Sequence, residues 1–353
     1  MKTSDFSFDL PEDLIAQYPT SVRGQNRLMT LDRLTGLRTH KRIEQLPEIL
    51  CSEYFLSPNG EKPLLVFNDS KVRKSRLIGE SLKSQARVEF LLLERLSDVQ
   101  WKTLVQRSSR RKAGSRYVFF DDTGNELTRA IITKEEGEFR FLEFDKSIND
   151  DFLDKYGHIP LPPYIKRNDT TSDAERYQTI YAKDSGSAAA PTAGLHFTQE
   201  LLDKLKENSI DMSFVTLHVG LGTFMPVRSE RIEDHVMHEE QFIITDENAK
   251  IIENAIEKKR KIIAVGTTSL RTLESAISSN GLKRDWQSTS IFIYPGYKFK
   301  IVDALFTNFH TPLSTLLMLV SAFATKELIL ESYSEAVKEK YRFFSYGDAI
   351  LIF

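Results

Sequence analysis

The chain has 353 residues, of which 41% are hydrophobic, so it can bury a core and has the length of one large domain plus a smaller one. This composition excludes a disordered or fibrous protein. The formal net charge is −2, with 48 basic and 50 acidic residues, so contact with a nucleic acid would require a local basic patch.

The expected compartment is the cytoplasm. Cys51 is the single cysteine, which excludes an intrachain disulfide and a multi-cysteine zinc site and indicates a reducing environment. The N-terminal sequence MKTSDFSFDLPEDLIAQYP carries acids where a secretory signal has a basic segment and an apolar run. The most apolar stretch, Leu313–Ala324, is shorter than the roughly 20 residues of a membrane-spanning helix, so it predicts a buried helix and no membrane partner.

Residues 72–144 have the pattern of a small β domain. The apolar runs RVEFLLLE, WKTLVQR, RYVFF, RAIIT and FRFLEF are short and separated by Gly, Asp and Asn, which are hairpin signals. They predict an antiparallel β-barrel inserted into an α/β domain formed by residues 1–71 and 145–353. The proline-rich segment GHIPLPPYIKR, residues 157–167, is interpreted as the return linker.

From about Phe197 onward, helix and strand patterns alternate. Residues 199–207 place leucines on one helical face, and MSFVTLHVG follows as a buried strand. A charged helix around Ile251–Ile256, the strand KIIAVGT, the helix SLRTLESAI and a strand SIFIYPG continue the pattern. This alternation predicts an α/β fold with largely parallel strands, because parallel pairing needs crossover elements.

Polar and glycine-rich loops follow these predicted strands. The strand ending at Leu217 leads into HVGLGTFMPVR, the one ending at Val265 into GTTSLRTLE, and the one ending at Ile293 into YPGYKF. Ligands of α/β folds collect beyond the carboxyl ends of strands, and Thr267 and Thr268 before a helix offer N–H groups and hydroxyls to an anion. The small residues of GSAAAPTAGLHFT, ending in a predicted helix start at His196, indicate tight packing or a ligand. Ordinary turns and helix caps explain the same residue types.

The segment DHVMHEE sets His235 and His238 beside Glu239, which is compatible with a metal site or an acid–base cluster. It lacks the HExxH spacing of common zinc hydrolases, so a surface or hydrogen-bonding role is more ordinary and no metal is expected. Near the end of the chain, aromatic and polar residues alternate from Tyr294 to His310 and in YRFFSYGDA. They suit either core packing or stacking on an adenine and cation–π contact with a sulfonium.

Taken in order and spacing, the segments GSAAAPTAGLHFT, LHVGLGTFMPVR, HVMHEE, VGTTSLRTLE, IFIYPGYKFKIVDALFTNFHTPLSTLLMLVSAFA and EAVKEKYRFFSYGDAILI resemble the S-adenosylmethionine:tRNA ribosyltransferase-isomerase family. FDLPEDLIAQYP, NDSKV and GHIPLPPYI extend the resemblance over nearly the whole chain. The resemblance implies an α/β domain interrupted by a β-barrel. It also implies transfer of the ribosyl part of S-adenosylmethionine to a 7-aminomethyl-7-deazaguanine at the tRNA wobble position, which yields epoxyqueuosine, adenine and methionine. S-adenosylmethionine is then a consumed substrate, and no cofactor is required.

This reaction needs a base for the ribose C5′ proton and an acid for the departing adenine. By residue type, the candidate bases are Glu239, Asp303 and Asp348, and the candidate acids or orienting groups are His196, His218, His238 and His310. Arg228 and Arg271 suit the methionine carboxylate or tRNA phosphate, with ion pairs to Glu230 or Glu274 as the structural alternative. The remaining expected substrate contacts are Thr223, Thr267, Thr268, Tyr294, Tyr297, Asn308 and Tyr346.

Two basic runs are expected to contact tRNA, and the protein is expected to act as a monomer. One run contains Arg107, Arg110, Arg111 and Lys112, and the other begins with Lys71 and Arg73; a solvated charged loop is the alternative. Two rival functions remain open at this point. One is a metal-dependent hydrolase centred on His235, His238 and Glu239, and the other is a non-catalytic RNA-binding module built on the barrel.

Overall fold

The computed structural model describes residues 1–220, 227, 229–279 and 281–353. It divides into two compact units. The first comprises Met1–Lys71, Pro163–Arg167 and Arg176–Phe353, and the second comprises Val72–Pro162 and Asn168–Glu175. Thr223 and Arg228, two of the expected substrate contacts, lie outside the described residues.

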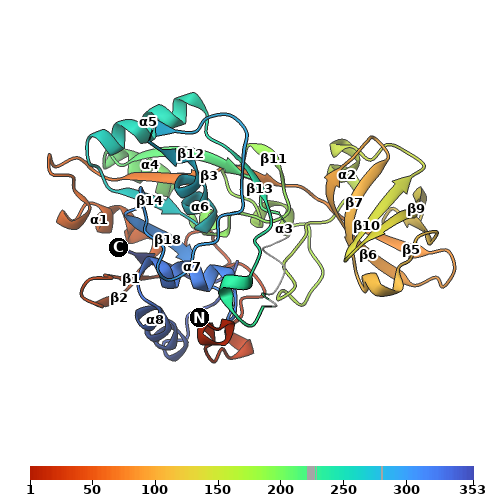
Figure 1. Ribbon diagram of the computed structural model, residues 1–353, viewed down its shortest axis with the longest axis horizontal. Coiled ribbons are helices and arrows are strands. Elements are labelled where there is room, and N and C mark those ends of the chain that lie inside the picture. The colour runs from red at the N-terminus through yellow and green to blue at the C-terminus, as the bar shows by residue number, and fades with distance from the viewer. Residues whose placement is uncertain (221–226, 228, 280) are drawn as a thin grey trace. The chain divides into compact units, whose positions relative to one another are not determined.

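A mixed β-sheet forms the centre of the first unit, with the strand order β17-β13-β12-β3-β14-β18-β19-β1-β2 (Figure 1). The central run β12-β3-β14-β18 is parallel throughout, β19 pairs in parallel with β1, and the other neighbours are antiparallel. This confirms the α/β fold with largely parallel strands. The strands span β1 Arg27–Leu31, β2 Arg38–Arg42, β3 Leu64–Asn68, β12 Asp211–Leu217, β13 Glu240–Ile243, β14 Ile262–Val265, β17 Gln287–Thr289, β18 Ala304–Asn308 and β19 Ala349–Ile352.

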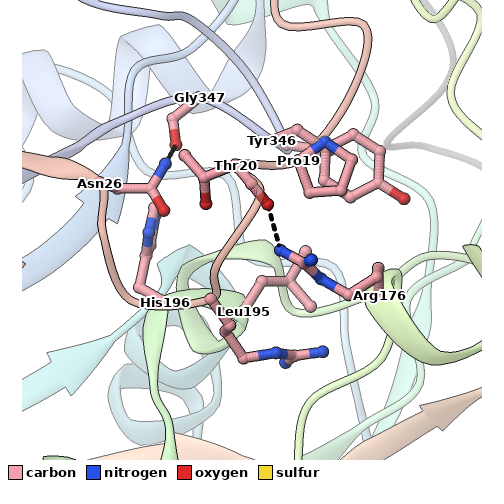
Figure 2. Close-up of a pocket in the computed structure, with 10 residues that line it drawn as sticks. Pro19, Thr20, Asn26, Arg176, Leu195, His196, Tyr346 and Gly347 are labelled. Atoms are coloured by element: carbon pink, nitrogen blue, oxygen red, sulfur yellow. Dashed lines mark hydrogen bonds between the residues drawn. The ribbon is translucent and has the colours of Figure 1, made fainter. Parts of the chain in front are cut away.

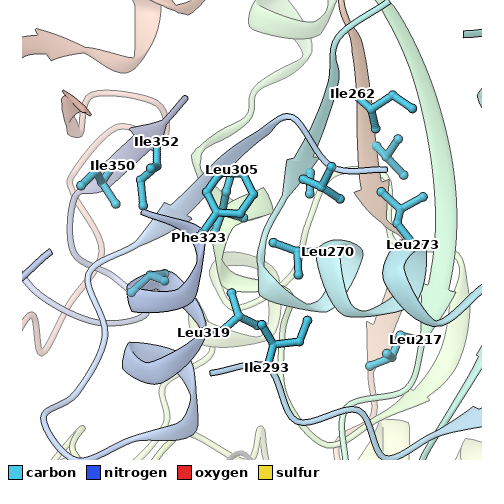
Figure 3. Close-up of a cluster of buried hydrophobic side chains, with 14 of the residues drawn as sticks. Leu217, Ile262, Leu270, Leu273, Ile293, Leu305, Leu319, Phe323, Ile350 and Ile352 are labelled. Atoms are coloured by element: carbon cyan, nitrogen blue, oxygen red, sulfur yellow. The ribbon is translucent and has the colours of Figure 1, made fainter. Parts of the chain in front are cut away.

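Helices cover both faces of this sheet. On one face, strand residues such as Leu217, Ile262 and Leu305 pack with Leu270, Leu273 and Leu319 from helices α6 and α7 (Figure 3). On the other face, Phe67 and Val265 pack with leucines of α1 and α4. Because neighbouring residues of a strand point to opposite faces, a strand covered on both sides is a continuous apolar run, which is the pattern of LLVF in β3.

Four helices of the first unit begin where the sequence supplies a side-chain acceptor. The hydroxyls of Thr198, Thr245, Ser314 and Thr325 accept hydrogen bonds from the backbone of the first turns of α4, α5, α7 and α8, each worth about 1 kcal/mol. No helix among the described residues is long and apolar enough to cross a membrane. The helices span α1 Leu46–Leu50, α2 Asp150–Tyr156, α3 Asp173–Arg176, α4 Gln199–Glu207, α5 Asp246–Glu257, α6 Thr267–Ala276, α7 Thr315–Phe323 and α8 Lys326–Lys338.

Two local expectations are wrong. The segment SIFIYPG is not a strand: β17 ends at Thr289, and Ile293 enters the core from an extended loop that precedes Pro295 and Gly296. His196 does not open a helix but ends the 3-10 turn Thr192–His196, and α4 starts after Thr198. In SIFIYPG, the apolar run predicts burial without fixing the hydrogen-bond partner.

The second unit is built on a closed antiparallel barrel with the order β10-β7-β6-β5-β8-β9. Its interior holds Trp101, Phe90 and Leu142, together with Ile148 and Leu153, which follow the last barrel strand. The unit therefore continues past Phe144. The strands are β5 Arg76–Ser81, β6 Arg87–Arg95, β7 Gln100–Val105, β8 Arg116–Phe120, β9 Glu126–Glu136 and β10 Phe139–Phe144, and the short strands elsewhere are β4 Ser70–Val72, β11 Asp184–Ser187, β15 Ile277–Ser278 and β16 Gly281–Leu282.

Candidate functional site

The carboxyl ends of β12, β3, β14 and β18 lie side by side because these strands are parallel neighbours. The residues that follow them are His218, Asp69, Gly266 and Phe309. In open α/β sheets, ligands bind in the crevice beyond such ends. This carboxyl edge is therefore the candidate ligand-binding region of the sheet.

Asp69 is a buried carboxylate at this edge that sequence reasoning did not single out. Its Oδ1 accepts a hydrogen bond from the Thr216 hydroxyl at 2.6 Å, and its backbone N–H bonds Val215 O at 3.0 Å. Burial raises the pKa of Asp69, and the Thr216 hydroxyl opposes that rise. The only available signal was its position in NDSKV, directly after a strand that is apolar on both faces.

The start of α6 presents free backbone donors at the same edge. Gly266 takes φ +91°, a conformation that favours glycine, and no side chain caps the helix. A Cβ at Gly266 would lie 3.5 Å from the Cβ of Ala193, so the small residues of the GSAAAPTAGLHFT segment pack against this loop. The Thr268 hydroxyl is buried without a hydrogen-bond partner among the described residues. The expected donor group at Thr267 and Thr268 is therefore present at a helix N-terminus, where an anion is stabilised.

Arg271 and Glu240 form a buried ion pair next to these donors. The second carboxylate oxygen of Glu240 accepts a hydrogen bond from Gly220 N at 3.2 Å. Nε and Nη2 of Arg271 have no partner within the part of the chain that the structure describes. The guanidinium is thus oriented by one carboxylate and retains donors for a second anionic group.

Glu274 does not pair with Arg271. Its buried carboxylate instead accepts hydrogen bonds from the Tyr297 hydroxyl at 3.1 Å and from the backbone N–H groups of Lys300, Ile301 and Val302. Burial, with the charge of Glu274, raises the pKa of Tyr297. These contacts fix the loop after the YPGY segment, in which Tyr294 is half-buried against Phe292.

His196 and Asn308 bond to each other below the same edge. The Asn308 side-chain amide donates to Phe344 O at 3.1 Å and lies 3.1 Å from His196 Nε2, which therefore acts as the acceptor. Burial, together with the charge of Arg23, lowers the pKa of His196 to about 3. His310 is similarly buried, with its Nε2 3.1 Å from the Thr307 hydroxyl, and burial lowers its pKa to about 3. Both rings are neutral near pH 7.

The three carboxylates expected as candidate bases do not gather around one point. Asp348 is buried and accepts from the backbone N–H groups of Arg27 at 2.9 Å and Arg342 at 2.8 Å, while burial raises its pKa. Asp303 precedes β18 and accepts from Ile262 N at 2.9 Å, at the amino ends of the parallel strands. Glu239 is exposed. Asp303 thus lies at the edge of the sheet opposite Asp69.

The other candidate histidines, His218 and His238, and their neighbour His235 lie close to β12 and β13 in the chain. His218 stacks on Trp286 with ring centroids 5.4 Å apart, and His235 packs edge-on against Phe292 at 5.2 Å. Burial and the nearby His238 lower the pKa of His235. Within the described ranges, no group of three His, Cys, Asp or Glu side chains is arranged to hold a metal ion.

A pocket in the first unit is lined by His196, Tyr346, Arg23 and Arg176, with Asn26 and Gly347 joined by a 2.7 Å hydrogen bond in its wall (Figure 2). Tyr346 packs edge-on against Tyr177. Of the expected residues, the structure brings His196 and Tyr346 together here. It places Thr267, Thr268 and Arg271 on one helix at the carboxyl edge of the sheet.

The expected tRNA contacts differ in how far their charge is already compensated. Arg73 pairs with Asp150 at 3.2 Å, and Lys112 pairs with Glu135 at 3.2 Å. Arg107 and Arg110 are exposed in the turn between β7 and β8, Arg111 is half-buried there, and Lys71 is exposed. Two of the basic residues are therefore engaged in ion pairs with the protein itself.

The fold and this site define an α/β protein with a polar carboxyl edge and a separate β-barrel unit. A family model described as "Queuosine biosynthesis protein" matches residues 3–352. The chain is therefore a member of the queuosine biosynthesis protein family.

Named relatives match the whole chain. It is 52% identical over 357 residues to the S-adenosylmethionine:tRNA ribosyltransferase-isomerase of Treponema denticola, and the match covers 100% of both. It is 48% identical over 354 residues to the protein of the same name from Clostridioides difficile, again with 100% of both covered. The crystal structure of an S-adenosylmethionine tRNA ribosyltransferase from Thermotoga maritima matches with a TM-score of 0.54 and 35% identity, covering 99% of this chain and 100% of that one.

Proposed function

We propose that this protein transfers and isomerises the ribosyl moiety of S-adenosylmethionine onto 7-aminomethyl-7-deazaguanine at the tRNA wobble position. The products are epoxyqueuosine in tRNA, adenine and methionine. The observation that carries this proposal is the 52% identity over the full length of both chains to a relative with this named activity. We propose that the protein acts in the cytoplasm, because its proposed substrate is tRNA and its single cysteine suits a reducing compartment.

S-adenosylmethionine is proposed to bind at the carboxyl edge of the sheet, with its methionine carboxylate at the start of α6. The supporting groups are the backbone N–H groups of Thr267 and Thr268, at a helix start without a side-chain cap among the described residues, and Nε and Nη2 of Arg271, which have no partner there. Tyr294 offers a half-buried ring for the adenine or the sulfonium. Thr223 and Arg228 remain proposed contacts on the basis of the resemblance.

Asp69 is our candidate for the base that removes the C5′ proton. Asp348 is tied to two backbone donors, Asp303 lies at the opposite edge of the sheet, and Glu239 is exposed. Among these carboxylates, Asp69 is the one that is buried at the carboxyl edge of the parallel strands β12 and β3, where the Thr216 hydroxyl donates to it. A carboxylate with a raised pKa is a stronger base once ionised.

The two most buried histidines are better suited to orient groups than to protonate adenine. With pKa values of about 3, His196 and His310 carry no proton to give near neutral pH. His218, stacked on Trp286 beside the end of β12, is the proposed acid, and His196 is proposed to orient Asn308. His238 remains a candidate from residue type alone.

The direct test incubates the protein with S-adenosylmethionine and tRNA that carries the aminomethyl-deazaguanine base. We expect release of adenine and a mass gain on the tRNA, and an Asp69→Asn variant that binds S-adenosylmethionine but turns over at least about 100-fold more slowly. Asp303→Asn is the matched control, since it removes a carboxylate at the far edge. Absence of any tRNA mass gain with the unmodified protein would reject the proposed reaction, and activity abolished by a chelator would favour a metal-dependent hydrolase.

A further inference from the structure

Arg23 and Arg176 line the pocket of Figure 2, and Arg27 and Arg342 lie next to the chain segments that line it. Arg176 donates from Nη2 to Thr20 O at 2.7 Å, and Arg342 donates to Tyr18 O. Arg27 donates to Glu339 O at 2.6 Å and stacks over the Tyr341 ring, with its guanidinium carbon 3.7 Å from the ring centre. We refer to Arg27, Arg176 and Arg342, with Arg23 on the pocket wall, as the arginine cluster.

The partners of Arg27, Arg176 and Arg342 seen in the described part of the chain position these guanidinium groups without neutralising them. A backbone carbonyl carries only a partial charge, whereas a carboxylate would cancel the charge of the guanidinium. In the described part of the chain, no ion pair joins Arg27, Arg176 or Arg342 to an acid. Asp348 binds the backbone N–H groups of Arg27 and Arg342 rather than their side chains, and so offsets one charge at most.

The cluster also lies beside groups that belong to the carboxyl edge of the sheet. His196 lines the pocket and bonds Asn308, the last residue of β18. Tyr346 and Gly347 line the same pocket, and Gly347 binds Asn26 of the N-terminal segment. A polyanion held by these arginines would therefore run past the proposed reaction site within a single compact unit.

We propose that the arginine cluster binds the phosphate backbone of the tRNA substrate and brings the target nucleotide to the carboxyl edge. This inference rests on the proposed function, which supplies a polyanionic substrate. A chain of net charge −2 has to hold tRNA through a local patch. Planar guanidinium groups suit phosphate, and here they are preset by carbonyls of the N-terminal segment. By contrast, Arg73 and Lys112 of the earlier expectation already have carboxylate partners.

The test uses the full-length protein with Arg176→Gln, Arg342→Gln and the double variant. Glutamine keeps a donor for the carbonyl of Thr20 or Tyr18 and removes only the charge. We expect weaker tRNA binding and a log–log salt dependence flatter by roughly 0.7–0.9 per lost phosphate contact, with unchanged affinity for S-adenosylmethionine. Arg176→Lys should restore most of the salt slope, because it restores the charge.

Arg284→Gln is the matched control, since Arg284 is paired with Asp246 and Glu253 in the same unit. Thermal melting of each variant separates lost binding from lost folding, and the Arg176 variant tests the cluster if the Arg342 variant does not fold. Unchanged tRNA affinity and slope in a folded Arg176→Gln variant, or a loss of S-adenosylmethionine affinity alone, would overturn the inference. Those outcomes leave adenine release by the unmodified protein intact, so the cluster can fail while the proposed reaction stands.

Discussion

Thr216 donates its hydroxyl to Asp69 across the β12–β3 pair, with the two oxygens 2.6 Å apart. The two residues occupy facing positions at the carboxyl ends of parallel neighbours, one step beyond the pairing of Val215 with Asn68. The hydroxyl stabilises the ionised form of a carboxyl group whose pKa burial has raised. The pair therefore sets the pH at which Asp69 can accept a proton.

Replacing Thr216 with Val should move the acid limb of the pH–rate profile to higher pH. A base acts only when ionised, and loss of a donor to the carboxylate raises the pKa of Asp69 further, so activity is lost first at low pH. We expect a shift of roughly one pH unit, from the strength of a hydrogen bond to a charged group. The measurement is kcat/KM for adenine release across pH.

Thr30→Val is the control for this shift, because Thr30 makes a hydroxyl hydrogen bond of the same length, 2.6 Å, to Thr39 at the β1–β2 pair. It should leave the profile in place. If the acid limbs of the pH–rate profiles of Thr216→Val and the unmodified protein superimpose, Asp69 is not the catalytic base.

Acid should destabilise the protein partly through His196 and His310. Both have pKa values of about 3 when folded against 6.5 for an unperturbed histidine, so the unfolded chain binds their protons first. Stability is then lost as pH falls from about 6.5 toward 3, by up to ~2 kcal/mol per histidine at pH 5. Urea unfolding at neutral pH and at pH near 5 measures how much unfolding free energy is lost on acidification. This loss should be smaller for His310→Gln than for the unmodified protein.

The comparison for that experiment is His238→Gln, which changes a part-exposed histidine. It should follow the acid sensitivity of the unmodified protein. Equal acid losses for His310→Gln and the unmodified protein would mean that His310 is protonated at pH 5 in the folded state.

The sequence predicts the fold well because burial on both sheet faces and the hairpin pattern are local signals. The apolar run of β3 and the alternating burial of β6 both follow from strand geometry. The SIFIYPG segment shows the limit of that logic. Its Ile293 is buried like a strand residue, but whether a partner strand lies beside it depends on the whole sheet.

The candidate site is less accessible to prediction, since it depends on which strands become neighbours. Asp69 and Thr216 are far apart in the chain and meet only because β3 and β12 pair in parallel. The position of Asp303, however, could have been anticipated. It precedes the strand ALFTN, so it belongs at the amino end of β18, away from the loops that follow the strands.

We expect the barrel unit to fold by itself as the fragment Val72–Pro162. Trp101, the single tryptophan of this fragment, is fully buried, and its Nε1 donates to Ile148 O at 3.2 Å. Ile148 and Leu153 complete the barrel core. A fragment ending at Phe144 lacks these groups and should be less stable by several kcal/mol, from the burial of two aliphatic side chains and one hydrogen bond.

Cooperative urea unfolding followed by Trp101 fluorescence compares the two fragments. The longer fragment, Val72–Pro162, should give one steep transition at higher urea. If neither fragment unfolds cooperatively, the barrel unit requires the rest of the chain to fold. The expectation that it is an independent inserted domain would then be wrong.

The last prediction concerns Arg271 and Glu240, whose side chains form an ion pair with both residues about 5% exposed. Sequence reasoning leads one to expect that Arg271→Ala weakens turnover without unfolding the chain. The burial of Glu240 changes that expectation, since removing one partner leaves an uncompensated charge, at a cost of ~3–5 kcal/mol. We therefore expect Arg271→Ala to unfold at a clearly lower urea concentration.

The double variant Arg271→Met with Glu240→Gln should recover most of this stability, because its neutral side chains fill similar space and the glutamine oxygen still accepts from Gly220 N. Turnover and S-adenosylmethionine affinity should stay low in the double variant if the guanidinium holds the methionine carboxylate. Urea midpoints and the Kd for S-adenosylmethionine, measured together, separate the role of Arg271 in stability from its role in substrate binding. Recovery of both quantities in the double variant would make Arg271 a structural residue only. An Arg271→Ala protein as stable as the unmodified protein would contradict the energetic importance of the buried ion pair.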